Sequence, residues 1–198
     1  MFISFEGIDG CGKSTQARML ADALRAEGRD VILTREPGGS PGAEEIRRLL
    51  VEGAGERWSG ETEALLFTAA RRDHLERTIH PALARGETVI TDRFADSTRV
   101  YQGAARGDLR DLVDRLHDLA IGLEPDRTFV IDIDPATGLS RGTARGGVED
   151  RFESLGLGFQ EKLAAGFRDL AAANPARVRL IDGRGTPEQV AARIRAAL

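Results

Sequence analysis

The chain has 198 residues, of which 41% are hydrophobic and 30% charged, with a formal net charge of −4. This length suits one domain with its own core, and the acidic balance gives no global electrostatic reason to bind nucleic acid or an anionic membrane. Cys11 is the only cysteine, which excludes an intrachain disulfide and favours a reducing compartment. No apolar run approaches the ~20 residues of a membrane span and no secretory signal opens the chain, so we expect a soluble, cytoplasmic protein without a membrane partner.

The stretch GIDGCGKST, from Gly7 to Thr15, matches the phosphate-loop pattern G-x-x-x-x-G-K-[ST]. It follows a short apolar run at 2–5 and opens into a helical pattern, which is the strand-loop-helix context that the motif needs. Glycines let successive N–H groups turn toward one anion, Lys13 adds a compact positive charge for the outer phosphates, and Ser14 offers a hydroxyl to Mg²⁺. The sequence therefore predicts a nucleoside triphosphate site with Mg²⁺.

A Gly-rich turn followed by a surface lysine is the alternative interpretation of this stretch. Lys13 and Lys162 are the only lysines among 28 basic residues, so nearly every other basic position is an arginine. At Lys13, a point charge suits a phosphate better than a planar guanidinium does. This choice of residue argues against a chance match.

The apolar runs predict five strands that alternate with helices. Strands are expected at 2–5, 31–33, 87–91, 127–132 and 178–182. Helices are expected from the loop to Gly28, at 43–51, 61–85, 109–123 and 159–170, and after a cap at Thr186 with Pro187 in first position. Pro81 should kink or tighten the long helix. The alternation indicates a single domain over residues 1–198, a three-layer α/β/α fold with a five-stranded parallel sheet of the P-loop NTPase type.

Polar residues follow two of the predicted strands, at the sheet edge where open α/β proteins bind ligands. Arg35 stands in the segment Thr34–Gly39 behind the second strand, although a solvated arginine in a turn explains it equally well. Asp92 closes the third strand, where a carboxylate in a phosphate-loop protein is placed to hold Mg²⁺ or its water. Arg93 beside it is placed to bridge donor and acceptor phosphates.

Phe67 and Arg71 lie one turn apart on a predicted helix, so they share one face. An aromatic ring with a guanidinium above it can stack a flat base and hydrogen-bond its edge. The more usual outcome for such a pair is a core phenylalanine and a surface arginine. Farther along, Tyr101 is the only tyrosine, and it precedes Gln102, whose amide can both donate and accept.

The segment from Ser140 to Glu153 departs from the pattern, because it holds Arg141, Arg145 and Arg151 among small polar residues with little apolar content. Arginines on a polar, flexible segment indicate a lid that closes over phosphates, spanning about residues 136–153. A solvated basic loop is the alternative, and it would be preferred in a chain without the phosphate loop.

Taken together, these motifs resemble the thymidylate kinase family of nucleoside monophosphate kinases. The resemblance runs nearly from end to end. It rests on the phosphate loop, Thr34-Arg35-Glu36-Pro37-Gly38-Gly39, Phe67 with Ala70-Arg71, Asp92-Arg93-Phe94, Tyr101-Gln102-Gly103 and Asp150-Arg151-Phe152-Glu153. The specific parts are TREPGG and the spaced DRF and YQG segments. The resemblance implies in-line transfer of the γ-phosphate of ATP to dTMP, giving dTDP, with Mg²⁺.

The family's site residues carry over to the matching positions. Phe67 would stack on thymine with Arg71 and Gln102 at the base edge, and Arg35 and Arg93 would hold the dTMP phosphate. The implied dTMP site comprises Asp9, Arg35, Phe67, Arg71, Arg93, Ser97, Tyr101 and Gln102. The implied ATP site comprises Gly7, Ile8, Asp9, Gly10, Cys11, Gly12, Lys13, Ser14, Thr15 and Arg141, with Ser14 and Asp92 on the metal.

One departure from the family pattern concerns catalysis. Some members carry an arginine in the loop at the position of Gly10, whereas others have none there and carry arginines in the lid, and this chain resembles the second group. Thr143 stands where richer lids place another arginine. The implied catalytic groups are Lys13, Arg93, Arg141 and Arg145.

The acceptor implied by the resemblance is a phosphate monoester, which is largely ionised at pH 7 because its second pKa is ~6. Such a nucleophile needs no general base. Asp9, which by resemblance contacts the 3′-hydroxyl of the acceptor, is therefore expected to bind the sugar rather than to take a proton.

Two other functions stay open at this point. A kinase of a different deoxynucleoside monophosphate would use similar motifs, and a nucleotide-dependent switch protein would use the same loop. GTPases normally read guanine through an N-K-x-D segment, and neither lysine lies in one. The stretch Asp182–Gly185 fits D-x-x-G, but it follows the last strand instead of an early one.

Family members are typically homodimers that pair through helices, so the resemblance implies a homodimer. Leu75, Ile79 and Leu83 recur at four-residue steps and suit either such an interface or the internal core. A structural metal is not expected, because no ligand spacing links the histidines, which are His74, His80 and His117.

Overall fold

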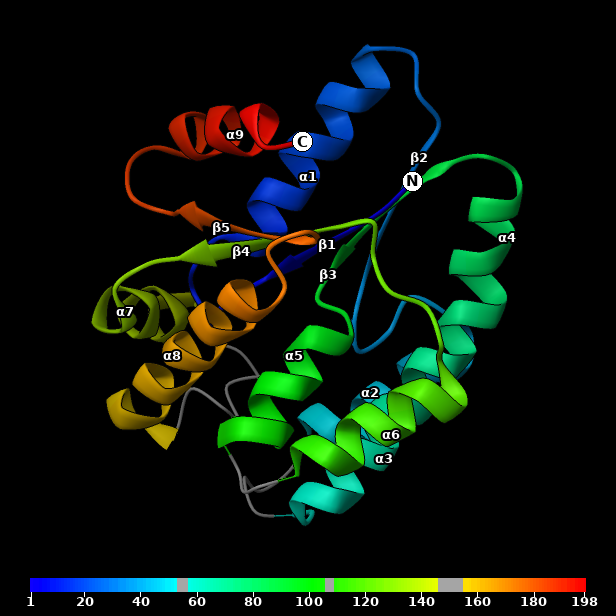
Figure 1. The fold of residues 1–198 in the computed structure, drawn as a ribbon, viewed down its shortest axis with the longest axis vertical. Helices are drawn as coiled ribbons and strands as arrows, with labels where there is room; N and C mark the ends of the chain where they lie inside the picture. The colour runs from blue at the N-terminus through cyan, green and yellow to red at the C-terminus, as the bar shows by residue number, and fades with distance from the viewer. Residues whose placement is uncertain (53–56, 106–108, 146–154) are drawn as a thin grey trace.

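The computed structural model describes residues 1–52, 57–105, 109–145 and 155–198. Five parallel strands form one sheet in the order β2-β3-β1-β4-β5, which confirms the predicted parallel sheet (Figure 1). The strands are β1 (Phe2–Glu6), β2 (Val31–Arg35), β3 (Thr88–Asp92), β4 (Arg127–Asp132) and β5 (Val178–Asp182).

The pairing of the central strand, β1, determines where the loops after the neighbouring strands lie. All five residues of β1 are buried, because β1 pairs with β3 on one side and β4 on the other and lies between layers of helices. The pairing aligns Phe5 of β1 with Asp92 of β3, and Arg35 of β2 with the same Asp92. The carboxyl ends of β1, β2 and β3 therefore finish side by side, where ligands bind in open parallel sheets.

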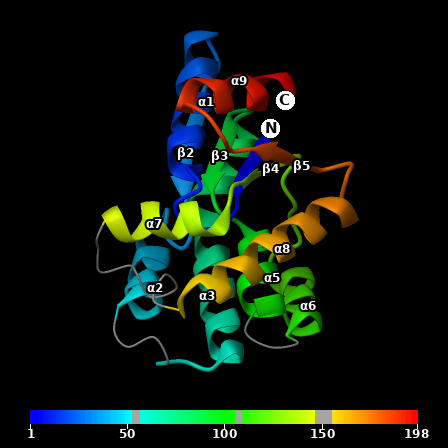
Figure 2. The same ribbon diagram turned by 90° about the vertical axis from the view of Figure 1, so that its left-hand side faces the viewer.

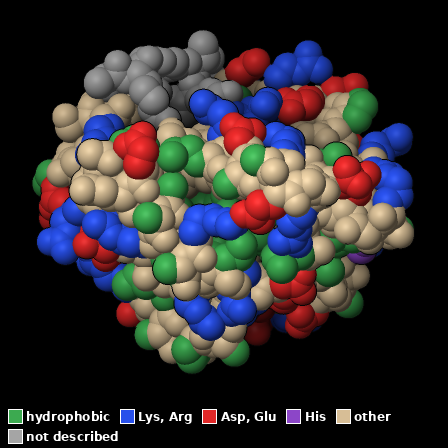
Figure 3. Space-filling view, turned by 90° about the horizontal axis from the view of Figure 1, so that it is seen from above, with side chains coloured by type: hydrophobic (Ala, Val, Ile, Leu, Met, Phe, Trp, Pro, Cys, Tyr) green, Lys and Arg blue, Asp and Glu red, His purple; other side chains and the backbone are tan. Residues whose placement is uncertain are grey.

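Helices form the outer layers. On one face of the sheet lie α1 (Lys13–Ala26) and α9 (Pro187–Ala196), and on the other lie α5 (Ala95–Val100) and α8 (Leu157–Ala173), as Figures 1 and 2 show. Farther from the sheet on that second side are α2 (Pro41–Val51), α3 (Gly60–His74) and α6 (Arg110–Ala120). Basic and acidic side chains are interspersed over the face seen from above (Figure 3). No helix in the described part of the chain has both the length and the apolar character that crossing a membrane requires.

The long helix predicted at 61–85 forms in three parts, which are α3, a π-helical turn at Leu75–Ile79, and α4 (His80–Ala84). The turn lies just before Pro81, which has no N–H to continue a regular helical ladder. A π-helical turn absorbs such a break in register, so the irregularity expected at Pro81 takes the form of a wider turn instead of a tighter one. Leu75 and Ile79 are fully buried in the chain's own core, which decides between their two possible roles in favour of the core.

The helix α7 (Pro135–Arg145) overturns one expectation. The flexible segment expected from Ser140 onward is helical as far as Arg145, so this prediction is wrong for its first six residues. The helix forms despite its small polar residues because the Asp134 carboxylate accepts hydrogen bonds from the backbone N–H and the hydroxyl of Thr137, both at 2.9 Å. Residues 146–153 of the expected lid, Arg151 included, lie outside the described residues.

Glu6 ends β1 as a fully buried carboxyl group. Its Oε1 accepts a hydrogen bond of 2.7 Å from the backbone N–H of Phe94, and its Oε2 accepts one of 2.5 Å from the Ser97 hydroxyl. Glu6 thereby joins the end of β1 to the start of α5. Burial raises the pKa of Glu6 to about 8, the Asp96 carboxylate adds to the rise, and Ser97, Arg93 and the Phe94 N–H oppose it.

Replacing Glu6 with Gln should change how stability depends on pH. The pKa of Glu6 lies above its ordinary value of 4.5, so the folded protein keeps a proton that the unfolded chain releases. Wild-type stability should therefore fall as pH rises from 4.5 through about 8, whereas Glu6→Gln lacks this loss. Over that range the free energy of unfolding of Glu6→Gln, measured by urea titration, should gain on the wild type by on the order of 2–4 kcal/mol.

The exposed Glu61→Gln is the control for this measurement, and its pH dependence should follow the wild type. A gap between Glu6→Gln and the wild type that stays constant from pH 4.5 to 8 would show that folding does not raise the pKa of Glu6.

Candidate active site

Residues of the phosphate loop line two cavities at the carboxyl edge of the sheet. The larger, of about 360 Å³, is lined by Gly10, Cys11, Gly12, Thr15, Gln16, Arg141, Gly183, Gly185, Pro187 and Val190. The smaller, of about 130 Å³, is lined by Asp9, Glu36, Pro37, Arg47, Val51, Phe67, Arg71, Arg93, Phe94, Ser97, Thr98, Tyr101 and Gln102. Adjacent loop residues, Asp9 and Gly10, thus face different cavities.

The phosphate loop has the backbone that its glycines predict. Gly10 and Gly12 adopt φ values of 74° and 102°, which residues with a Cβ rarely take, and Gly12 stands at the start of α1. The Lys13 ammonium lies over the loop, with Nζ 2.7 Å from the carbonyl oxygen of Ile8 and 3.1 Å from that of Gly7. Lys13 is only 6% exposed, so its charge is held at the loop itself. This arrangement concentrates positive potential where phosphates would sit.

Ser14 and Asp92, the two predicted metal ligands, come together in the structure. The Ser14 hydroxyl donates a short hydrogen bond to Oδ2 of Asp92, joining the first turn of α1 to the end of β3. Hydroxyl and carboxylate oxygens are the hard ligands that Mg²⁺ takes, usually together with water and substrate phosphates. Within the described residues no group of three or more His, Cys, Asp or Glu side chains could hold a metal by itself. The donor set therefore fits a Mg²⁺ ion that arrives with a nucleotide.

The helix α7 packs directly against the tip of the phosphate loop. A Cβ on Gly10 would lie 2.1 Å from the carbonyl oxygen of Gly138, and a Cβ on Gly138 would lie 2.8 Å from the carbonyl oxygen of Asp9. The position where some family members carry a loop arginine is thus closed here by the backbone of α7. Arg141, one turn farther along α7, lines the larger cavity. The backbone of Arg145 belongs to the same helix, but its side chain lies outside the described residues.

Arg93 links the phosphate loop to the smaller cavity. Its guanidinium donates to Oδ1 of Asp9 at 2.5 Å, to the Ser97 hydroxyl at 2.9 Å and to the Tyr101 hydroxyl at 3.1 Å. Its backbone has φ of 73°, a strained value for a residue with a Cβ. The strain is held by a hydrogen bond from the Arg93 N–H to the Phe5 carbonyl at 2.9 Å.

Asp9 and Tyr101 are kept in opposite protonation states by their surroundings. Burial disfavours the carboxylate, yet Arg93 and Lys13 together hold the pKa of Asp9 below its usual value. Burial raises the pKa of Tyr101 well above its usual value. The nearby Arg93 charge lowers this pKa and the Asp9 charge raises it further, so the pKa stays high. Tyr101 therefore stays protonated, and its hydroxyl donates a hydrogen bond of 3.0 Å to Oδ2 of Asp9. Asp9 is an ionised acceptor at neutral pH.

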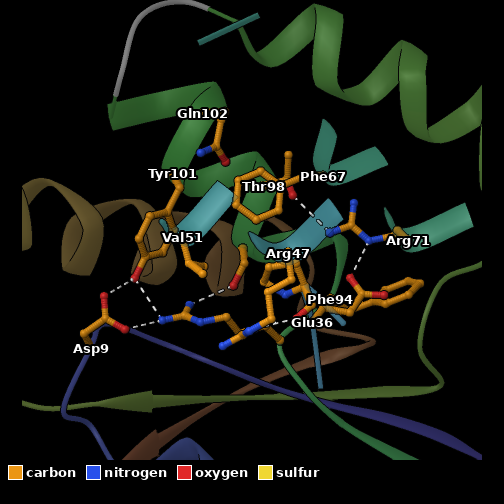
Figure 4. A pocket seen from close by; sticks show the side chains of 13 residues that line it. Asp9, Glu36, Arg47, Val51, Phe67, Arg71, Phe94, Thr98, Tyr101 and Gln102 are labelled. Carbon is orange, nitrogen blue, oxygen red and sulfur yellow. Dashed lines mark hydrogen bonds and ion pairs between the residues drawn. The ribbon is translucent and has the colours of Figure 1, made fainter. Parts of the chain in front are cut away.

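The other end of the smaller cavity is built around Arg71, which is only 4% exposed. Its Nε donates to Oε2 of Glu36 at 2.7 Å and its Nη2 donates to Oγ1 of Thr98 at 3.0 Å, as Figure 4 shows. The guanidinium also lies 5.2 Å from the ring centre of Phe94. Phe67, in contrast, is only partly buried and lines the cavity. The usual outcome for this pair, a core phenylalanine with a surface arginine, is therefore reversed here.

Gln102 completes the cavity wall. It is 1% exposed, and its Nε2 donates to Oε2 of the buried Glu63 at 3.2 Å. That bond orients the amide, because a carboxylate can only accept. Seven of the eight residues in the predicted dTMP site line the same cavity, which are Asp9, Phe67, Arg71, Arg93, Ser97, Tyr101 and Gln102.

Arg35 is the predicted residue that this cavity does not include. Its side chain is 55% exposed, and it pairs with the Glu44 carboxylate of α2 at 3.1 Å. Alternation along β2 explains the difference, since Arg35 points outward while the next residue, Glu36, turns inward to Arg71. This alternation was the signal that could have identified Glu36.

Arg47 is a second cavity residue that the motifs did not indicate. It reaches the cavity from α2, where its Nη1 donates to the Pro37 carbonyl at 2.5 Å. Its spacing on α2 matches no motif, so only the packing of α2 against the Thr34–Gly39 segment places it there.

Comparisons with known proteins show the family of the chain. A sequence model described as thymidylate kinase matches residues 5–194. The thymidylate kinase of Dinoroseobacter shibae is 70% identical over 196 residues, covering 99% of this chain and 95% of the relative. That of Caulobacter vibrioides is 55% identical over 194 residues, covering 98% and 93%. The crystal structure of thymidylate kinase from Ehrlichia chaffeensis matches with a TM-score of 0.80 and 37% identity, covering 100% of this chain and 97% of that one.

The family model, the curated relatives and the solved structure each extend over nearly the whole chain, and they confirm the resemblance found in the motifs. The chain belongs to the thymidylate kinase family, the ATP-dependent nucleoside monophosphate kinases that phosphorylate dTMP to dTDP.

Proposed function

We propose that the smaller cavity binds dTMP and the larger one binds ATP, so that the phosphoryl group passes between them at the loop. The observation that carries this proposal is the position of Asp9 and Gly10, neighbours in the chain that line the two cavities. Two substrates bound there would present their phosphates to Arg93 and Lys13 across one loop. Holding two reactants in this way supplies much of the rate of a phosphoryl transfer.

In the smaller cavity, Phe67 stacks on the thymine ring while Arg71 and Gln102 address its edge. The support for these roles is burial and prior orientation, since Glu36 and Glu63 fix the two polar groups before any substrate arrives. Ser97 and Tyr101 hold the Arg93 guanidinium near the dTMP phosphate. Asp9 is ionised and already accepts a hydrogen bond from Tyr101, and it accepts another from the 3′-hydroxyl of the sugar.

Arg35 acts on the dTMP phosphate only after it exchanges its partner. Its guanidinium is bonded to Glu44, and Glu44 also accepts the Gly39 N–H at 3.0 Å. The dianionic phosphate of dTMP is the group that could replace Glu44 on Arg35.

In the larger cavity, the phosphate-loop residues from Gly7 to Thr15 wrap the ATP phosphates, and Ser14 and Asp92 hold Mg²⁺. The metal, when bound, neutralises phosphate oxygens of ATP. Lys13, Arg93, Arg141 and Arg145 offset the repulsion between the two polyanions as charge moves to the bridging oxygens. No residue needs to act as a general base, because the acceptor is itself an ionised phosphate.

We further propose that residues 1–198 act as one kinase domain with a lid at about 136–153, and that the enzyme works in the cytoplasm as a homodimer. The support for the dimer is a pair of exposed apolar side chains on helices that lie side by side. Leu65 of α3 is 53% exposed and Leu119 of α6 is 83% exposed. A second copy would remove both from water.

Acceptor preference tests the proposed function. Purified protein with ATP and Mg²⁺ should produce ADP in a coupled assay when dTMP is added, and less with dUMP, dCMP or dGMP at the same concentration. An absence of dTMP-dependent ADP production would reject the function, and a higher rate with another acceptor would reassign the smaller cavity.

The lid arginines can be tested by removing both. Arg141→Ala combined with Arg145→Ala should lower kcat by at least ~10²-fold, with a smaller change in KM for dTMP, because these groups act on charge that develops during transfer. Arg85→Ala is the control, since this exposed arginine lines neither cavity. An unchanged kcat in the double variant would move the catalytic charge to other residues.

A further inference from the structure

The segment Thr34–Gly39 makes buried contacts that its sequence motif does not explain. The family resemblance gives a role to Arg35 alone, and that side chain points away from the smaller cavity. The residues on either side of it, Thr34 and Glu36, turn the other way and meet His74 near the end of α3. His74 is 0% exposed and is not among the residues that line the cavity.

The imidazole of His74 is bonded through both of its nitrogens. Nδ1 lies 3.0 Å from Oε1 of Glu36, and Nε2 lies 2.8 Å from Oγ1 of Thr34. Gly39 covers the ring, because a Cβ there would lie 2.4 Å from both Nε2 and the Thr34 hydroxyl oxygen. The Thr78 hydroxyl, also from the α3–α4 region, donates to the Gly39 carbonyl at 2.8 Å. The backbone of this segment is thus closed over His74.

The Glu36 carboxylate fixes the direction of the hydrogen bonds that it receives. A carboxylate oxygen can only accept, so Nδ1 of His74 carries the proton that it donates to Glu36. Nε2 shares its hydrogen bond with the Thr34 hydroxyl, which can donate or accept. The second oxygen of Glu36 accepts from Nε of Arg71 at 2.7 Å. Thr34, His74, Glu36 and Arg71 therefore form one connected chain of hydrogen bonds that ends at the cavity wall.

At the end of this chain of hydrogen bonds, not every N–H group of Arg71 is used. Nε is used by Glu36 and Nη2 bonds Thr98, while Nη1 makes no hydrogen bond to the residues that the structure describes. A guanidinium offers donors only. It therefore suits a base with a carbonyl at its edge, as thymine has at C4, and opposes one with an amino group there, as cytosine has.

We propose that His74 is a positioning residue for recognition of the base. It holds the Glu36 carboxylate in the orientation that fixes Arg71, and so it sets the preference for a carbonyl over an amino group at C4. This role rests on the proposed binding of dTMP in the smaller cavity. Removing His74 leaves one buried oxygen of Glu36 without a donor, which frees the carboxylate to turn and release Arg71.

The test compares two substitutions of His74. His74→Phe keeps the ring volume and removes both hydrogen bonds, whereas His74→Asn keeps an amide N–H close to the position of Nδ1. The measurements are KM and kcat for dTMP, KM for ATP, and the inhibition constant of dCMP against dTMP. The ratio of the dCMP inhibition constant to KM for dTMP reports base discrimination and does not depend on the fraction of enzyme that is folded.

His74→Phe should raise KM for dTMP about tenfold and lower the discrimination ratio about tenfold, the effect of losing one hydrogen bond to a charged group. Its kcat at saturating dTMP and its KM for ATP should stay within about threefold of the wild type. His74→Asn should recover most of both losses. Glu36→Gln serves as a second variant and should lower the ratio as His74→Phe does, because its amide group cannot accept from both His74 and Arg71.

Three outcomes would overturn the proposal. In the first, His74→Phe keeps the wild-type discrimination ratio, and in the second, His74→Asn fails as completely as His74→Phe. In the third, KM for ATP rises as much as KM for dTMP, which is the mark of a merely structural role. Failure of the proposed function is distinct, since it would show as a wild-type enzyme that does not use dTMP.

Discussion

The active site depends on the contact between Arg93 and Asp9, which joins the ends of two adjacent strands. Asp9 belongs to the loop after β1 and Arg93 directly follows β3, and the parallel pairing of these strands brings the two loops together. Arg93 reaches Asp9 from a strained backbone conformation. The next residue, Phe94, is held by a hydrogen bond from its N–H to the Glu6 carboxyl group. A buried carboxyl, a strained turn and an ion pair therefore form one unit. Because the ion pair lines the smaller cavity and Asp9 adjoins Gly10, which lines the larger one, this unit fixes the position of one cavity relative to the other.

The sheet was predictable from the sequence because its signals are local. Each apolar run contains its own strand, and the loop at Gly7–Ser14 carries its own backbone requirements in its glycines. The helix α7 was missed because its signal is not local. Its residues are small and polar, and it is held by a cap from Asp134 and by contact of Gly138 with the phosphate loop, about 128 residues earlier in the chain. Propensity alone could not supply that contact.

The composition of the site was largely predictable, but its burial was not. Helical spacing placed Phe67 and Arg71 on one face and could not say which of them enters the core. The deciding groups are Glu36, which is 35 residues away from Arg71 in sequence, and Thr98, which is 27 away. Together they take two donors of the Arg71 guanidinium, and the Glu36 carboxylate pairs its charge, which offsets the usual penalty for burying a charge.

The two ends of the smaller cavity are prepared for a ligand in the same way. Arg93 is paired with Asp9 and Arg71 with Glu36, so each guanidinium has a carboxylate beside it before any ligand arrives. Nε of Arg93 and Nη1 of Arg71 make no hydrogen bond to the residues that the structure describes. Under the proposed binding of dTMP, the phosphate and the base carbonyl would therefore each add a bond without breaking an ion pair.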